Sequence, residues 1–292
     1  MDKRILIICG DNLGVGYDQI SYPYIEYLTY PVIVEQEEYR ESETYTASWL
    51  FDKFRKEKVT AKSSSLRMNE MIDIVEKNKK DFDLIIHVVM GSNMSAATLK
   101  IAEEVRQKYK EEIKIINIDT RQATAGVGVI LFRLIDFIKE NQEEEDIINY
   151  AQDLVKNTFT LYVLPDLNYL YRGGRIGKAK ALLGSLLRIL PVVSLMGDNP
   201  DGEVLPVGQG RTYKQAHSVI VETLRKKMEE RNLQEIPLSV VAGDEMNKDN
   251  ILALKEEIEN KLPVKKSMVG KIHLVEAIYL GPGGYGVAVC MK

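Results

Sequence analysis

The sequence predicts an α/β protein in which a parallel α/β layer is followed by an antiparallel sheet with flanking helices. Its 292 residues exceed the length at which one hydrophobic core usually stops growing, so two domains are expected. In the first half, short β-branched runs alternate with amphipathic stretches, which is typical of parallel sheets. In the second half strand-like runs predominate, and the turn sequence GDNPDGE joins two of them as in an antiparallel pair.

Four runs of the first half are predicted as buried strands, at residues 4–9, 31–35, 84–90 and 113–118. The stretch SAATLKIAEEVRQKYKEE, between the last two, places Ala102, Val105 and Tyr109 on one face of a helix. A strand, a helix and a strand in that order predict a parallel βαβ unit. Further helices are predicted after the serine-rich turn at 63–65, over 128–141 and in the stretch IINYAQDLVKNT.

We place a domain boundary near residue 155, so that residues 1–155 form the N-terminal domain and residues 156–292 the C-terminal domain. Strands of the C-terminal domain are predicted at residues 159–163, 192–196, 204–207, 238–242, 273–278 and 285–290. Helices are predicted at residues 213–230 and 250–261.

Charge and cysteine content restrict the class of protein. With 39 basic and 43 acidic residues, the net charge of −4 gives no overall attraction to nucleic acid or anionic lipid. Cys9 and Cys290 lie in strand-like runs without metal-ligand spacing, which predicts core residues in a reducing cytosol and no metal site. The N-terminal MDKRILIICG is too short for a secretory signal, and the longest apolar run, at 182–196, falls short of the roughly 20 residues of a spanning helix. We expect a cytoplasmic protein without an integral membrane segment; transient contact with a membrane surface stays open.

Familiar catalytic patterns are missing. The sequence contains no G-x-S-x-G elbow, Walker loop, H-E-x-x-H or paired C-x-x-C, and GDNLGVG does not match G-x-G-x-x-G. The three histidines, His87, His217 and His273, have no nucleophile placed beside them by any pattern in the sequence. We therefore predict no catalytic residue and no cofactor.

Two hydroxyl-rich turns are candidate sites for an anionic group. Ser92 and Ser95 follow a buried strand at the start of a helix, where hydroxyls and free backbone N–H groups suit a carboxylate or a phosphate. The alternative for Ser95 is that it only caps the helix. Ser63 and Ser64 precede another predicted helix and are candidate donors of the same kind.

The stretch NYLYRGGRIGKAKALLGSLLRILPVV places a basic, glycine-containing segment directly before an apolar run. It favours an anion-binding loop, a membrane-surface element or one wall of a pocket for a ligand with a charged end and an apolar remainder. The glycines predicted to shape loops beside the ligand are Gly173, Gly174, Gly281 and Gly283. For the last two, the alternative is a tight turn between strands.

These residues occur in an order that resembles the DegV family of bacterial fatty-acid-binding proteins, some of which present the acyl group to a fatty acid kinase. The most specific parts are LNYLYRGGRIGKAKALLGSLLRILPVV and DGEVLPVGQGRTYKQA; KSSSLRMNEM, MGSNMSAAT, IDTRQATAGVG and LGPGGYG agree more weakly. The sequence departs from the family pattern at Tyr279, where a histidine is usual, at Ser63 in place of a threonine and at Gly91 in place of a serine. Asp11 and Asn12 are the closest match to an Asp-Ser pair.

The resemblance implies a Rossmann-like N-terminal layer, a C-terminal antiparallel sheet and a long-chain fatty acid between them. It implies that the carboxylate is bound by Ser63, Ser64, Ser92, Ser95 and Tyr279. The acyl chain would contact Leu182, Leu183, Leu186, Leu187, Ile189 and Leu190, unless these are ordinary core residues. Arg175 and Arg211 would contact a kinase subunit or a developing phosphate. Two alternatives stay open: an enzyme acting on a small phosphorylated or carboxylated metabolite, and a lipid-sensing protein that has no kinase.

Overall fold

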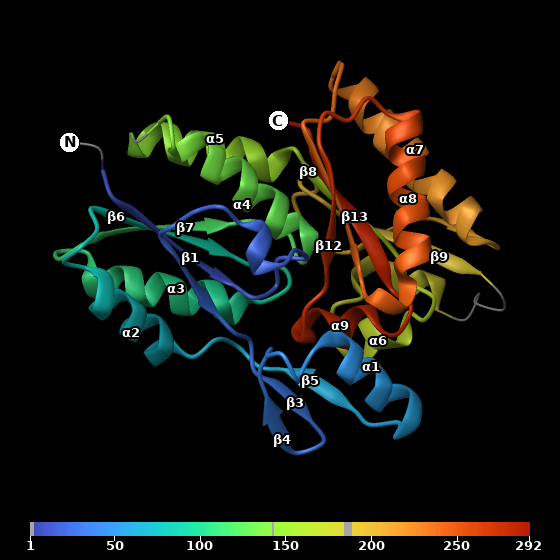
Figure 1. Ribbon diagram of the computed structural model, residues 1–292, viewed down its shortest axis with the longest axis horizontal. Coiled ribbons are helices and arrows are strands. Elements are labelled where there is room, and N and C mark those ends of the chain that lie inside the picture. Colours follow the sequence, from blue (N-terminus) through green and yellow to red (C-terminus); the bar gives the residue numbers. More distant parts are fainter. Residues whose placement is uncertain (1–2, 142, 184–188) are drawn as a thin grey trace.

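The computed structural model describes residues 3–141, 143–183 and 189–292. A four-stranded parallel sheet in the order β2-β1-β6-β7 forms the centre of the first half of the chain (Figure 1). Its strands are β1 (Ile5–Gly10), β2 (Ile25–Leu28), β6 (Leu84–Val89) and β7 (Lys114–Asp119). β1 and β6 are buried along their whole length, as expected of apolar strands that helices cover on both faces.

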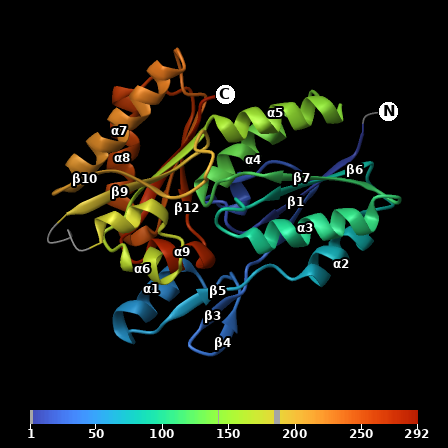
Figure 2. The ribbon, with the colours of Figure 1, turned by 180° about the vertical axis from the view of Figure 1, so that it is seen from behind.

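Helices lie on both faces of the parallel sheet (Figures 1 and 2). On one side are α2 (Met68–Asn78) and α3 (Ala96–Tyr109), and on the other α4 (Ala125–Ile138) and α5 (Glu144–Lys156). The predicted apolar face of α3 is its buried face. α4 is apolar on nearly all sides because it packs against the second sheet as well as the first.

Six strands form the second sheet, in the order β10-β9-β8-β13-β11-β12. They are β8 (Thr158–Val163), β9 (Leu190–Met196), β10 (Leu205–Gly210), β11 (Leu238–Gly243), β12 (Ser267–Lys271) and β13 (Tyr285–Cys290). Neighbouring strands are antiparallel except β11 and β12, which run parallel. The GDNPDGE turn joins β9 to β10 as the predicted antiparallel pair. The predicted α/β class, with a parallel layer and a mostly antiparallel sheet, is confirmed.

The two faces of the second sheet belong to different cores. Its helices are α7 (Tyr213–Glu230) and α8 (Lys248–Lys261). They cover the outer face, where Leu161 of β8 and Val192 of β9 are buried. The next residue along each strand, Tyr162 or Val193, belongs to the inner core that also contains the parallel sheet. This alternation follows from the two-residue period of strands, and it turns every second side chain of β8 and β9 toward the first half of the chain.

A small antiparallel sheet and short helices pack beside the ends of both large sheets (Figure 1). The sheet has the order β4-β3-β5, with β3 (Val32–Val34), β4 (Glu37–Tyr39) and β5 (Ala61–Ser63). The short helices are α1 (Ala47–Lys56), α6 (Asn168–Arg172) and α9 (Leu274–Leu280). Short 3-10 helices are η1 (Tyr17–Gln19), η2 (Gly177–Leu182) and η3 (Glu245–Asn247).

One strand prediction is wrong, and another strand lies outside the large sheets. Residues 273–278, predicted as a strand, contribute to the helix α9. Glu276 accepts the backbone N–H of His273 at 2.5 Å, and Glu41 accepts that of Leu274 at 2.6 Å, which gives partners to N–H groups of the first turn. Because six of its seven residues are buried, α9 shows no polar face in the sequence. Residues 31–35 contribute β3 of the small sheet, and β2 completes the parallel sheet instead.

The predicted domain boundary at residue 155 lies close to where α5 ends and β8 begins. The inner core nevertheless runs without a break from the parallel sheet to the inner face of the second sheet. The division into residues 1–155 and 156–292 stays a prediction.

Candidate functional site

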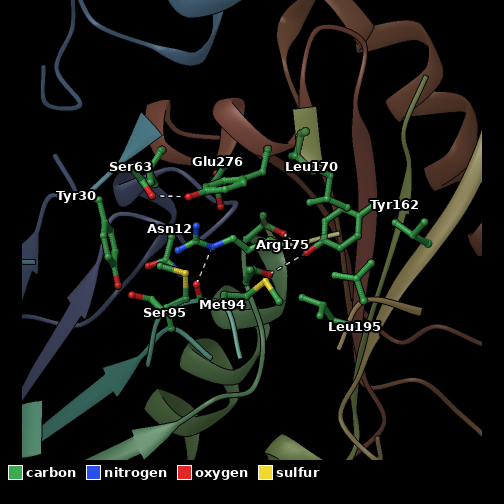
Figure 3. A pocket seen from close by; sticks show the side chains of 18 of the residues that line it. Asn12, Tyr30, Ser63, Met94, Ser95, Tyr162, Leu170, Arg175, Leu195 and Glu276 are labelled. Carbon is green, nitrogen blue, oxygen red and sulfur yellow. Dashed lines mark hydrogen bonds between the residues drawn. The ribbon is translucent and has the colours of Figure 1, made fainter. Parts of the chain in front are cut away.

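A cavity of about 300 Å³ lies between the two large sheets (Figure 3). On the side of the parallel sheet, its wall includes Asn12 after β1 and Met90 after β6. On the other side it includes inward-facing residues of β8 and β9, and α9 closes it with Glu276 and Tyr279. The edge at which parallel strands end is where α/β sheets usually bind ligands, because loops there expose backbone and side-chain polar groups.

Ser63 and Tyr279 meet at one end of the cavity. A short hydrogen bond joins their hydroxyl groups (Figure 3). Ser63 is the last residue of β5 and is paired with Val32 of β3, so the small sheet fixes its position. Two hydroxyls that bond to each other have one further hydrogen to donate, and their oxygens can still accept. This pair therefore suits a polar head group, and residues 216 apart in the sequence build it.

Glycine residues allow the aromatic side chains beside this pair to approach the backbone. A Cβ at Gly173 would lie 2.5 Å from the ring of Tyr279, and one at Gly281 would lie 2.3 Å from the ring of Tyr169. Gly281 also has a φ of +67°, in the left-handed region that ends α9. Gly174 and Gly283 adopt positive φ as well, in the neighbouring turns. The four predicted loop glycines shape the surroundings of the cavity without lining it.

The predicted serine donors lie in different places. Ser64 and Ser95 line the cavity together with Ser63. Ser95 occupies the N-cap position of α3, but its hydroxyl bonds to that of Thr98 at 2.8 Å and not to a backbone N–H. Ser92 is outside the lining: its hydroxyl donates to Asp119 at 2.6 Å, and its backbone N–H donates to the same carboxylate at 2.9 Å. Both of its donors thus hold the loop to the end of β7.

The two predicted arginines are also separated. Arg175 lines the cavity, with Nε donating to the carbonyl of Met94 at 3.1 Å and Nη1 to that of Gly173 at 2.6 Å. Its guanidinium carbon lies 5.4 Å from the centre of the Tyr279 ring. Arg211 is exposed after β10, where its backbone N–H bonds to Gln215. Only Arg175 can therefore contact a ligand in the cavity.

The apolar lining differs from the one predicted. Leu182, Leu183, Ile189 and Leu190 are half-buried outside the described lining, while Leu186 and Leu187 fall outside the residues that the structure describes. The described apolar lining comprises Met90, Met94, Ala123, Leu164, Leu170, Val193, Leu195, Val204, Val275 and Leu280. The prediction chose the most apolar run, whereas the alternation in the run PVVSLM, residues 191–196, is the signal that points Val193 and Leu195 inward.

Several polar residues of the cavity were not predicted. Tyr162 bonds to the hydroxyl of Thr124 at 3.0 Å, on the side of the second sheet. Asn12 and Glu276 are 2% and 3% exposed, and the side-chain amide of Asn12 and Oε1 of Glu276 have no hydrogen-bond partner among the described residues. Both side chains line the cavity. Asn12 matches the family's Asp-Ser pair only in part, and Glu276 lies in a segment predicted as a strand, so the sequence predicts neither as a ligand contact.

A buried group of titratable side chains lies behind Glu276. Asp11 accepts the backbone N–H of Tyr30 through both carboxylate oxygens at 3.2 Å. Burial raises the pKa of Asp11 to about 7, against the lowering effects of that hydrogen bond and of nearby His273. Burial lowers the pKa of His273, but Glu276, Glu41 and Asp11 raise it by more, so it ends above its ordinary value.

Residues 14–292 match the family model described as "Uncharacterised protein, DegV family". The chain belongs to the DegV family. A DegV domain-containing protein of Clostridium acetobutylicum is 28% identical over 294 residues, which cover 99% of this chain and 100% of that protein. The resemblance seen in the sequence is thereby confirmed.

Solved DegV structures share the fold. A fatty-acid-binding DegV family protein from Thermus thermophilus has a TM-score of 0.89 and 26% identity, over 99% of this chain and 100% of that one. A stearic acid-binding protein from Eubacterium ventriosum has a TM-score of 0.84 at 18% identity, over 98% of both chains. At 18% identity this likeness shows the fold alone.

Neither a membrane-spanning helix nor a cluster of metal ligands occurs among the residues that the structure describes. No helix among them combines the length and the apolar character needed to cross a bilayer. Within residues 3–141, 143–183 and 189–292, no three His, Cys, Asp or Glu side chains come together as candidate metal ligands.

Proposed function

We propose that this DegV protein binds a long-chain fatty acid in the cavity between its two sheets. The observation that carries the proposal is the cavity itself, whose lining combines the hydroxyl groups around Ser63 with a larger number of aliphatic side chains such as Val193 and Leu195. Burying a methylene contributes about 0.8 kcal/mol, so about fourteen methylenes would contribute on the order of 11 kcal/mol before ordering costs are subtracted. The chain would supply most of the affinity, and the polar end would fix its orientation.

The head group would lie beside Ser63, Tyr279 and Arg175. A buried polar group without partners is penalised, so hydrogen-bond donors at the end of the cavity are needed. Ser64 and Ser95 add hydroxyls to the same lining. Tyr279, where the family pattern has a histidine, supplies a phenolic hydroxyl. Because the hydroxyl of Ser92 donates to Asp119, we infer that Ser92 stabilises its loop and does not contact the ligand.

Extraction of lipid from the purified protein, followed by mass spectrometry, tests this function. We expect a long-chain acid in amounts close to one per chain and displacement of a fluorescent fatty acid by unlabelled palmitic acid. The absence of both would contradict the proposal and would favour a small polar metabolite as the ligand.

We further infer that the protein is a carrier without catalytic activity of its own, which presents the bound acid to a separate kinase subunit. That subunit would bring ATP and the metal. The exposed Arg211 and the basic residues around Arg175 offer positive charge toward a partner or a developing phosphate. Hydroxyl donors leave a carboxyl oxygen more reactive than a bidentate arginine pair would.

The kinase step has its own test. Loaded protein, a bacterial fatty acid kinase subunit and ATP are mixed, and acyl phosphate is trapped with hydroxylamine as the hydroxamate. We expect hydroxamate to form with the wild type and to decrease with Arg175→Ala. If no hydroxamate forms while the acid stays bound, the kinase step is contradicted and a lipid-sensing role without a kinase is favoured.

A further inference from the structure

Glu276 and Asn12 are unpaired polar residues buried at the wall of the cavity. Oε2 of Glu276 accepts the N–H of His273 at 2.5 Å, whereas Oε1 has no partner among the described residues. Neither the amide nitrogen nor the oxygen of Asn12 has one. Buried polar atoms are nearly always hydrogen-bonded in proteins, so unpaired polar atoms on two residues that line a cavity indicate a polar group beside them.

The two unpaired side chains need different hydrogen-bond partners. A carboxylate oxygen only accepts hydrogen bonds, while an amide both donates and accepts. A fatty acid carboxylate could accept from Asn12, Tyr279 or Arg175, but it has no hydrogen to donate to Glu276. Two carboxylates facing each other in a cavity also repel. A head group with an O–H can donate its one hydrogen to Oε1 of Glu276 and accept from the amide N–H of Asn12.

The surroundings of Glu276 favour its acceptor role. Nδ1 of His273 lies 3.6 Å from Oε2, and the imidazole of His273 stacks on Tyr17 with ring centres 5.2 Å apart. The hydrogen bond and charge of Glu276 are the strongest of the influences that raise the pKa of His273. The titratable and charged groups around Glu276 are Asp11, Tyr17, Glu41, Tyr162, His273, Tyr279 and Arg175. Arg175 already donates to two backbone carbonyls and lies over the Tyr279 ring.

We propose that Glu276 accepts a hydrogen bond from the head group, so that the cavity prefers a long apolar chain that ends in an O–H. Two kinds of molecule supply this chemistry: the un-ionised form of a fatty acid and a fatty alcohol. The inference rests on the proposed function and narrows it, since it specifies the form of the head group that is bound.

The test compares palmitic acid, hexadecanol and methyl palmitate as displacers of a fluorescent fatty acid. For the wild type at about pH 8, we expect hexadecanol to bind about tenfold more tightly than the ester, which has no O–H, and more tightly than the ionised acid. Between about pH 8 and about pH 5, binding of the acid should strengthen while binding of the alcohol stays constant. An alcohol preferred at both pH values would identify the alcohol as the better ligand.

Glu276→Gln is the decisive variant, because its amide oxygen can still accept the N–H of His273 and so preserves the start of α9. At about pH 8, we expect this variant to gain about tenfold in affinity for the acid relative to hexadecanol, since the amide can donate to the carboxylate. Glu41→Gln is the matched control: Glu41 accepts the N–H of Leu274 in the same turn but does not line the cavity, so its ratio should stay at the wild-type value.

The failures can be told apart. If none of the three displacers binds the wild type, the proposed function fails and this inference fails with it. If all three bind, and Glu276→Gln leaves the ratio of acid to alcohol unchanged, the fatty-acid site stands and the role of Glu276 is overturned.

Discussion

The polar end of the cavity is assembled from segments far apart in the sequence, whereas two neighbouring strands supply much of the apolar end. Asn12, Ser63 and Tyr279 come from the end of β1, from β5 and from α9. Val193 and Leu195 are alternate residues of β9, beside Tyr162 of β8. The polar end depends on single hydrogen bonds and the apolar end on space. Substitutions at the apolar end should therefore change which chain lengths the cavity prefers, and substitutions at the polar end should change its affinity for the head group.

Blocking the apolar end should have the largest effect. Leu195→Trp would fill space that the chain needs and displace about four methylenes, a loss of about 3 kcal/mol or on the order of a hundredfold in affinity for palmitic acid. An acid of ten carbons should lose far less, which calorimetric titration of both acids would show. Ser194→Val is the control, since Ser194 lies next to Leu195 on the opposite face of β9 and should not affect binding. Equal losses for both acids would mean that the chain does not reach Leu195.

Behind the polar end, Asp11→Asn should change stability more than binding. Because the pKa of Asp11 is raised to about 7 in the folded protein, the wild type loses stability as pH rises from 3.8 to about 7. Asparagine can still accept the N–H of Tyr30 and carries no charge. We expect the variant to match the wild type near the low end of this range and to be more stable above it, on the order of 2 kcal/mol. Urea unfolding across this pH range measures the difference in unfolding free energy between the variant and the wild type. A difference that does not change with pH would contradict the raised pKa of Asp11.

At the polar end, single hydroxyls should have moderate effects. Ser63→Ala and Tyr279→Phe each remove one partner of the same hydrogen bond and should weaken palmitic acid binding by about tenfold. The double variant should lose less than the sum, because the two groups act together. Ser92→Ala is the control, with unchanged binding and a small loss of stability from its broken bond to Asp119. Weakened binding of palmitic acid by Ser92→Ala would show that Ser92 contributes to the ligand site.

The smallest effect is expected at the surface beside the cavity. Lys178 pairs with Asp201 at 2.8 Å and with Glu203 at 3.4 Å, and all three side chains are about half exposed. Such pairs contribute about 0.5 kcal/mol, so Lys178→Ala should reduce the melting temperature only slightly and leave ligand affinity unchanged. A strong loss of binding would show that the turn between β9 and β10 helps to close the cavity.

The sequence predicts one end of this site far better than the other. Ser63, Ser64 and Ser95 stand in turns beside strand or helix ends, where polar residues are conspicuous and a family pattern aids recognition. Val193 and Leu195 look like any buried strand residues, and only the three-dimensional arrangement shows that space is left beside them. The fold class and most strands follow from alternation and periodicity. The sequence does not predict α9 as a helix because α9 is buried on nearly all sides and lacks the polar face by which a helix is recognised.

The position of β13 in the second sheet has a consequence for how the chain acquires its shape during translation. β13 lies between β8 and β11, so the middle of that sheet stays open until residue 290 has left the ribosome. Until then α4, which needs the second sheet to cover its outward side, exposes apolar surface. A nascent chain that stops before β13 therefore exposes apolar surface of the kind that chaperones bind. It also lacks a complete wall for the cavity and cannot yet enclose a lipid.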